Sequence, residues 1–177
     1  MNTLAMKSAS APLPAIGAEP IDSRIGKYLS FHLGNEEFGI QVLQVREIIG
    51  VQDITAVPKT PGYMKGVINL RGKVIPVIDL RMKFGLEEIP YSQRTCIIVV
   101  QVDEENGRML MGIVVDGVSE VITINADDVE DTPDFGDGTK HPYILGLAKM
   151  KDRVKILLDI DAVLSRQEFE GLHSIMK

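Results

Sequence analysis

The chain has 177 residues, of which 45% are hydrophobic and 25% are charged, a composition typical of globular domains. Its formal net charge is −6, aromatic residues make up 5% and tryptophan is missing. Binding of nucleic acid or of an acidic membrane surface is therefore not expected, because both require a basic face, and stacking on bases also requires aromatic side chains. The chain has no long uninterrupted apolar run, so direct insertion into a membrane is not expected either.

The N-terminal residues 1–26 are rich in Ala, Ser and Pro and show no periodicity, which predicts a flexible tail. Pro12, Pro14 and Pro20 interrupt its apolar stretch, so it does not resemble a signal peptide. The single Cys96 cannot form an internal disulfide. These features favour a cytoplasmic protein in which Cys96 is a small buried residue.

Short β-branched segments separated by turn residues dominate the rest of the chain, and they predict an all-β fold. The predicted strands are residues 28–33, 38–42, 66–70, 74–80, 95–102, 109–115 and 118–124. Residues 66–70 and 74–80 flank Arg71-Gly72-Lys73 and are expected to form a hairpin. Pro76 predicts that the second of these strands lies at a sheet edge or carries a bulge. Residues 161–176 form a plausible C-terminal helix.

An internal repeat is the most informative pattern in the sequence. Residues 38–49 align without gaps with residues 111–122, and residues 63–79 align with residues 143–159. The two alignments occur in the same order, with the extra residues placed in an acidic, glycine-rich stretch at 131–140. We expect a first β-barrel repeat at 27–90 and a second at 91–177 with the C-terminal helix, with strands that could be exchanged between the barrels.

Catalytic and metal-binding motifs are not legible in the sequence. His32, His141 and His173 are far apart and share no ligand spacing. The acidic residues between 127 and 137 lack the spacing and the terminal glutamate of a calcium loop. No nucleophile elbow, phosphate-binding loop or dinucleotide fingerprint is present. The sequence therefore predicts no enzyme, no metal and no cofactor.

Two charged residues are candidates for binding chemistry. Arg71 falls in a tight turn where its guanidinium could pair with a carboxylate, and Glu47 falls in an otherwise apolar strand. The residues themselves favour an ordinary solvated side chain at each position and leave the binding interpretation open.

Residues 65–81, KGVINLRGKVIPVIDLR, resemble the signature of CheW, the family of bacterial chemotaxis coupling proteins. Residues 36–48 and 112–118 resemble two further motifs of that family, and the likeness covers about residues 27–164. The resemblance implies two SH3-like five-stranded β-barrels in tandem with short connecting helices, no catalysis and no cofactor.

The resemblance also implies partners. These are the regulatory domain of a CheA-type histidine kinase and the cytoplasmic tips of methyl-accepting chemoreceptors, so the protein is expected in the cytoplasm, recruited to membrane receptor arrays. Receptor state would then control kinase autophosphorylation. The positions that match residues implicated in this coupling are Val45, Glu47, Gly50, Gly66, Arg71 and Val118.

Two other functions stay open. A β module could sense a small molecule or peptide in a groove between the barrels, and an enzyme could assemble a site from distant residues. Neither has a motif in its favour. The chain shows neither the phosphotransfer and ATP-binding domains of a CheA kinase nor the receiver domain of a CheV-type adaptor, so a stand-alone coupler is expected.

Overall fold

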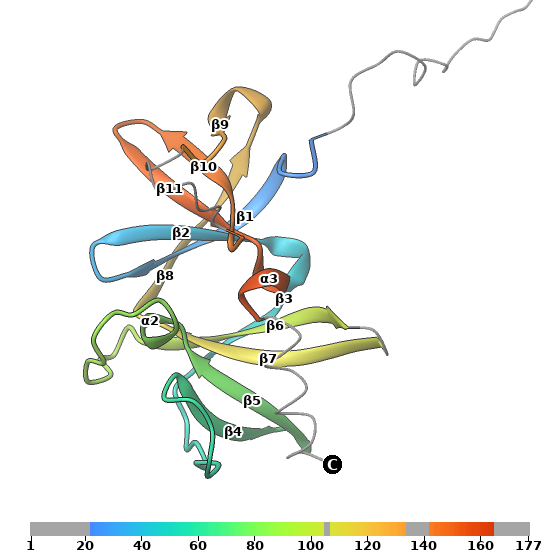
Figure 1. The fold of residues 1–177 in the computed structure, drawn as a ribbon, viewed down its shortest axis with the longest axis vertical. Coiled ribbons are helices and arrows are strands. Elements are labelled where there is room, and N and C mark those ends of the chain that lie inside the picture. Colours follow the sequence, from blue (N-terminus) through green and yellow to red (C-terminus); the bar gives the residue numbers. More distant parts are fainter. Residues whose placement is uncertain (1–21, 105–106, 134–141, 165–177) are drawn as a thin grey trace, which may run out of the picture.

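The computed structural model describes residues 22–104, 107–133 and 142–164. In this part of the chain almost all regular structure is β, arranged as two barrel-like sheets stacked along the long axis (Figure 1). The strands are β1 (Gly26–Leu33), β2 (Glu36–Gln41), β3 (Val45–Gly50), β4 (Met64–Leu70), β5 (Lys73–Asp79), β6 (Cys96–Glu104), β7 (Gly107–Val115), β8 (Gly117–Ile124), β9 (Val129–Glu130), β10 (Ile144–Met150) and β11 (Arg153–Leu158). The short helices are η2 (Val42–Gln44), α2 (Leu80–Lys83), η3 (Ala126–Asp128) and α3 (Ile160–Val163). The all-β class with two tandem barrels is confirmed.

Both sheets take strands from both sides of residue 90. One sheet has the order β8-β1-β2-β11-β10-β9, and we call it the terminal barrel because it holds the first and last strands. The other has the order β3-β6-β7-β5-β4, and we call it the central barrel. The boundary at residue 90 separates the two sequence repeats and stays a prediction. The two sheets do not divide at this residue, because each contains strands from both repeats.

The internal repeat reappears in the way the strands pair. In the central barrel β5 runs parallel to β7, and in the terminal barrel β11 runs parallel to β2. The amide of Asp79 donates to the Tyr63 carbonyl at 2.7 Å, and the amide of Asp159 donates to the Tyr143 carbonyl at 2.8 Å. The β4–β5 and β10–β11 hairpins carry a register shift at the same place, before Gly66 and Gly146. The two barrels are thus related position by position.

The predicted hairpin at 66–80 is present as β4 and β5, which pair antiparallel. Its turn bends through left-handed backbone at Arg71, with φ 50°, and at Gly72, with φ 88°. Gly72 meets this requirement without strain, whereas Arg71 adopts a conformation that is uncommon for a residue with a Cβ.

Of the two predictions for Pro76, the edge strand is wrong, because β5 lies between β7 and β4. The β4–β5 pairing does carry a register irregularity nearby, where Ile78 and Val77 face Met64 and Gly66. The parallel pairing with β7 involves only residues 77–79. Pro76 therefore occupies the part of β5 that has a neighbour on one side, where its missing N–H costs no hydrogen bond of that ladder.

Three apolar clusters hold the structure together. The largest lies between the barrels and includes Leu29 and Phe31 of the terminal barrel and Ile98 and Met111 of the central barrel. A second fills the central barrel and a third fills the terminal barrel. Strand β6 is buried on both faces, as its continuous apolar sequence predicts, because one face packs in the central barrel and the other between the barrels.

Some predicted features fall outside the described residues. These are the tail up to residue 21, the helix beyond Leu164, the acidic stretch at 134–140, and His141 and His173. Cys96 is partly buried rather than fully buried, and this burial raises the pKa of its thiol.

Candidate functional site

Glu47 and Arg71 meet on the surface of the central barrel. The Arg71 guanidinium donates to the Glu47 carboxylate. The Arg71 side chain is 71% exposed and the Glu47 side chain is 30% exposed. The Asn69 side chain accepts from the Gly72 amide at 2.8 Å, which fixes the turn that carries Arg71. The pair therefore joins β3 to the β4–β5 turn at a half-exposed position, where an ion pair contributes little to stability and its charges stay accessible.

This ion pair lies at the mouth of the central barrel, on the rim of a pocket of about 640 Å³. The lining residues are Arg46, Glu47, Leu70, Arg71, Lys73, Ile75, Val99, Gln101, Arg108, Met109 and Leu110. Ile75 and Val99 are buried members of the cluster inside this barrel. Four of the lining residues are cationic and one is anionic, so the pocket combines an apolar floor with a basic rim.

Gly66 has a structural reason to be glycine. Its backbone has φ 141°, and a Cβ there would lie 2.0 Å from the Thr55 carbonyl oxygen. Thr55 and residue 67 exchange two backbone hydrogen bonds of 2.9 Å, so the segment after β3 closes against β4 at this point. Gly50 differs, because it is exposed and a Cβ would have no atom within 4 Å.

Val45 and Val118 are equivalent residues of the repeat, at the start of β3 and of β8. Both are partly buried, and both pack against the apolar cluster between the barrels. They do not line the pocket at the mouth of the central barrel. The six predicted residues therefore divide into a charged pair on one barrel, two valines beside the inter-barrel core, and two glycines.

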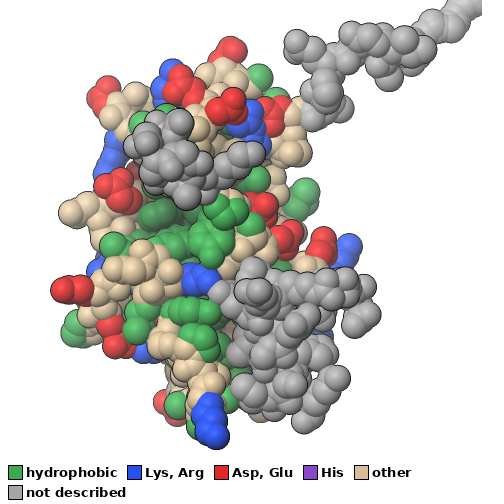
Figure 2. Space-filling model, in the orientation of Figure 1, with side chains coloured by type: hydrophobic (Ala, Val, Ile, Leu, Met, Phe, Trp, Pro, Cys, Tyr) green, Lys and Arg blue, Asp and Glu red, His purple; other side chains and the backbone are tan. Residues whose placement is uncertain are grey.

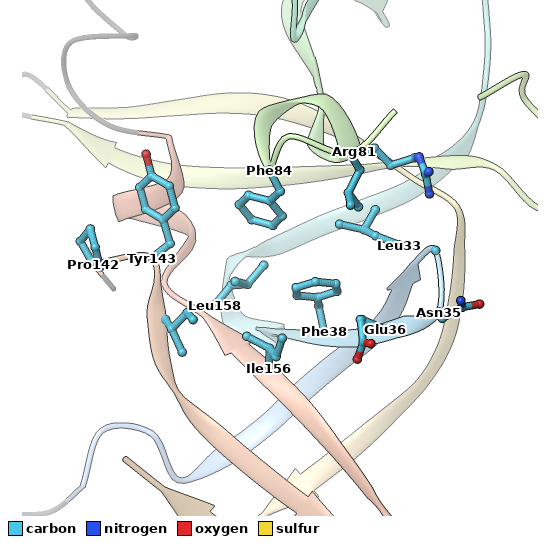
Figure 3. A pocket seen from close by; sticks show the side chains of 13 residues that line it. Leu33, Asn35, Glu36, Phe38, Arg81, Phe84, Pro142, Tyr143, Ile156 and Leu158 are labelled. Carbon is cyan, nitrogen blue, oxygen red and sulfur yellow. The ribbon is translucent and has the colours of Figure 1, made fainter. Parts of the chain in front are cut away.

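A second pocket, of about 690 Å³, lies between the barrels. Its side chains come from the β1–β2 turn, α2 and the β10–β11 hairpin, and Phe84 and Phe38 face one another across it (Figure 3). Phe38 and Phe84 have ring centroids 5.8 Å apart, and Phe84 and Tyr143 have centroids 6.3 Å apart. Hydrophobic side chains gather at the middle of this face (Figure 2). Neither Val45 nor Val118 lines this pocket.

A polar junction closes one side of the inter-barrel pocket. The Arg81 guanidinium lies 2.7 Å from the Asp116 carboxylate, with the two side chains only 13% and 17% exposed. Asp116 also accepts from the Gly34 amide at 2.6 Å. This junction ties α2 of the central barrel to the β1–β2 turn of the terminal barrel. The sequence analysis missed it, because its members are 35 and 82 residues apart and no local pattern connects them.

Residues 22–104, 107–133 and 142–164 contain no group of three or more His, Cys, Asp or Glu able to hold a metal ion. Burial raises the pKa of the Asp79 carboxyl, but its hydrogen bonds from Met82 and Arg81 cap α2, so its role is structural. None of the described helices is both long and apolar enough to span a bilayer.

Comparison with known proteins agrees with this geometry. The family model described as a CheW-like domain matches residues 27–168. The chemotaxis protein CheW of Klebsiella aerogenes is 40% identical over 151 residues, which cover 85% of this chain and 89% of that protein. The chemotaxis protein CheW of Treponema pallidum is 30% identical over 151 residues, covering 83% of this chain and 86% of that protein.

A solved structure shares the fold as well as the sequence. The crystal structure of the scaffolding protein TtCheW from Thermoanaerobacter tengcongensis superposes with a TM-score of 0.70 at 32% identity, covering 81% of this chain and 95% of that chain. Proteins of this family are non-catalytic scaffolds. The chain therefore belongs to the CheW-like family, and it is a chemotaxis adaptor without catalytic activity.

Proposed function

We propose that this adaptor couples chemoreceptors of the methyl-accepting type to a CheA-type histidine kinase, so that receptor state controls kinase autophosphorylation. Family membership supports the chemotaxis context. The presence of two related barrels supports a two-sided adaptor, because each barrel offers a surface of its own. We place the protein in the cytoplasm, recruited to membrane receptor arrays.

The observation that carries the proposal is the Glu47–Arg71 pair on the rim of an apolar-floored pocket. Charged groups at a rim guide the approach and orientation of a partner, while the apolar floor supplies burial. Because the pair is half-exposed, we expect its loss to weaken binding modestly rather than to abolish folding.

Val45 and Val118 are proposed to mark a second docking surface, for an apolar face of a receptor helix. Their equivalence in the repeat supports this, because the same residue type stands at the same place in both barrels beside the shared core. Gly50 is proposed to let a partner approach the backbone at the end of β3. Gly66 is proposed to act indirectly, by holding the β4–β5 hairpin that presents Arg71.

Control of the kinase requires that the receptor's signalling states differ in contact free energy with the adaptor and kinase. A receptor that binds equally well in both states shifts no population. The proposal is therefore a statement about a three-component complex and not about pairwise affinity alone.

Co-sedimentation tests the assembly. Receptor signalling fragments on vesicles, the cognate CheA-type kinase and the adaptor are mixed, and the kinase in the pellet is measured. We expect kinase to pellet in quantity only when the adaptor is present. Equal pelleting with and without the adaptor, under conditions where the adaptor itself pellets, would refute coupling.

A second candidate, sensing of a small apolar molecule, is favoured by one observation, the aromatic-walled pocket between the barrels. A ligand bound there would raise the melting temperature, since ligand binding to the folded state stabilises it. A screen of apolar compounds by thermal shift, with Phe84→Asp as the control, would separate this candidate from the adaptor function.

A further inference from the structure

The pocket between the two barrels is largely apolar, and aromatic rings form its wall. Phe38 of β2 and Phe84, which follows α2, face one another across it, and Tyr143 stands beside Phe84 (Figure 3). Leu86 also lines the pocket and is 41% exposed, so part of this apolar surface is open to solvent. Its volume of about 690 Å³ falls within the range of roughly 300–1,000 Å³ that is usual for ligand sites. The pocket is therefore large enough to take a short apolar segment.

The described chain begins close to this pocket. The Gln41 side chain at the end of β2 donates to the Ser23 carbonyl at 3.0 Å, and the Arg24 guanidinium donates to the Leu145 carbonyl on β10 at 3.4 Å. Both strands also line the pocket, β2 through Phe38 and β10 through the residue that precedes Leu145. Phe38 lies three residues from Gln41, which is about 10 Å along a strand. The N-terminal tail therefore leaves the barrels within reach of the pocket.

The tail contains an uncharged segment with two prolines. Residues 8–18 include no Asp, Glu, Lys or Arg, and residues 11–16 read Ala-Pro-Leu-Pro-Ala-Ile. Proline favours the extended polyproline conformation, and aromatic-walled grooves bind such segments because little conformational entropy remains to be lost. Proline also has no N–H, so two of these six residues bring no backbone donor that would need a partner in an apolar pocket. The segment thus matches the pocket in polarity and in conformation.

The C-terminal residues 165–177 also follow an element near the pocket, because Leu158 lines it two residues before α3 begins. They are a poorer match, since four of these thirteen residues are charged. Burial of a charge in an apolar pocket without a partner is costly. The tail segment is therefore the better occupant.

The connection to the barrels makes even weak docking of the tail effective. Five residues separate the segment at 11–16 from Asp22, and they can span at most roughly 20 Å. A short tether gives an effective concentration on the order of 1 mM. A segment that binds as a free peptide with a Kd of about 0.1 mM would then occupy the pocket about 90% of the time.

We propose that residues 11–16 of this chain dock in an extended conformation in the pocket between the barrels and act as an internal ligand. The docked segment covers apolar surface of both barrels, and any molecule or protein segment that enters the pocket must displace it. At about 90% occupancy the apparent affinity of such a competitor falls about tenfold. The inference goes beyond the coupling of receptors to a kinase and does not rest on it, because the chain itself contains both the segment and the pocket.

The accessibility of residue 13 tests whether the segment is docked. The chain has no tryptophan, so a single tryptophan in the tail gives an unambiguous fluorescence signal. Leu13→Trp places it within the segment, and Leu4→Trp, in the same tail but outside the segment, is the matched control. In the full-length chain we expect the acrylamide quenching constant of Leu13→Trp to be at least about threefold smaller, because docking shields the side chain from solvent. Equal quenching constants would show that the segment is solvated and that the inference is wrong.

Two further substitutions in the Leu13→Trp chain locate the docking site. Leu86→Asp puts a charge on the pocket lining at a half-exposed residue, and Leu43→Asp puts the same charge at a residue that is 93% exposed and lies outside the lining. We expect Leu86→Asp to raise the quenching constant to the Leu4→Trp value and Leu43→Asp to leave it unchanged, with circular dichroism confirming that both are folded. Persistent shielding in a folded Leu86→Asp chain would place the segment elsewhere and overturn the assignment to this pocket.

Substitutions within the tail test the role of the prolines without altering the barrels. In the Leu13→Trp chain, Pro12→Gly with Pro14→Gly is expected to raise the quenching constant about twofold or more, because glycine loses more conformational entropy on docking. Pro20→Gly, outside the segment, is the control and is expected to leave it unchanged. An unchanged constant in the double variant would refute docking in the polyproline conformation. Shielding that disappears on dilution would mean that the tail of a second copy fills the pocket, and would contradict docking within one chain.

Discussion

Gly66 is held by two constraints at once, a left-handed backbone and a neighbouring carbonyl oxygen that leaves no room for a Cβ. Gly50, on the same barrel, has neither constraint. We propose that Gly66 serves coupling through the shape of the hairpin, because a side chain at this position would collide with the Thr55 carbonyl.

Replacing Gly66 by alanine is expected to lower the free energy of unfolding by roughly 3 kcal/mol, because overpacking and backbone strain add at this position. Gly50→Ala is the matched control and is expected to change it by less than about 0.5 kcal/mol. Urea denaturation of both variants measures the difference. Equal free energies of unfolding for Gly66→Ala and Gly50→Ala would show that the hairpin accommodates the added methyl group without strain.

Arg71 is expected to act through its charge at the rim. Arg71→Glu would place two carboxylates where an ion pair now lies, so partner affinity is expected to fall about tenfold while the melting temperature changes by only a few degrees. The charge-swapped double variant, Glu47→Arg with Arg71→Glu, restores an ion pair but reverses its direction. Full recovery of binding by the swap would mean that the pair is structural and contacts no partner.

The reactivity of the Cys96 thiol reports how well the structure shields the start of β6 from solvent. Since burial raises the pKa of its thiol, less thiolate is present at pH 8 than in a free cysteine. Its modification by a thiol reagent is expected to be slower than that of cysteine in the unfolded chain, and the rate should rise on adding denaturant. Reaction at the unfolded rate under native conditions would contradict this placement.

At the scale of elements, the internal repeat includes a short helix after each hairpin, α2 after β5 and α3 after β11. Asp79 accepts from the amides of Arg81 and Met82 at the start of α2, and Asp159 accepts from Ala162 at the start of α3. An aspartate that ends a strand and caps a one-turn helix is thus used twice, at equivalent positions of the two barrels.

Loss of the capping aspartate is expected to lower the free energy of unfolding more at α2 than at α3. Asp79→Ala removes two hydrogen bonds that the carboxylate accepts from backbone amides, at a residue that is 3% exposed, and should lower the free energy of unfolding by about 1–2 kcal/mol. Asp159→Ala removes one such hydrogen bond and should lower it by less. Thermal unfolding of the two variants compares them directly. The reverse order would mean that the helices are held by packing and not by their caps.

The positions of most strands were predictable from the sequence, because short β-branched segments and the turn glycines between them specify strands and turns locally. The full pairing of strands was not, since β1 and β2 pair with one another but also join β8 and β11, which lie far along the chain. The burial of Lys155 was equally hidden. A lysine in an alternating strand is ordinarily solvated, and its acceptors Ser30 and Glu120 come from distant strands. Glu47 and Arg71 were found because the motif marks them, but nothing local showed that they form a pair.

At the scale of the whole molecule, the two barrels are joined by an apolar core and by polar contacts, among them the Arg81–Asp116 pair. The inter-barrel cluster draws residues from both sheets, and the Arg81–Asp116 pair ties α2 to the β1–β2 turn. The barrels should therefore unfold together, in a single cooperative transition detected equally by far-ultraviolet circular dichroism and by calorimetry.

Breaking the junction tests this coupling of the barrels. Asp116→Ala leaves the largely buried Arg81 without its countercharge and is expected to lower stability by about 3 kcal/mol. Asp131→Ala, which removes a carboxylate that is 91% exposed, is the control and should have little effect on stability. An unchanged stability of Asp116→Ala would show that the apolar core alone fixes the barrels.

The central claim, that this adaptor makes kinase activity depend on receptors, is tested most directly by the rate of kinase autophosphorylation. The cognate CheA-type kinase is assayed alone, with receptor fragments, with the adaptor, and with both. We expect strong stimulation only when all three proteins are combined, and a much smaller stimulation with Arg71→Glu. Equal rates with and without the adaptor, although the three proteins assemble, would contradict it.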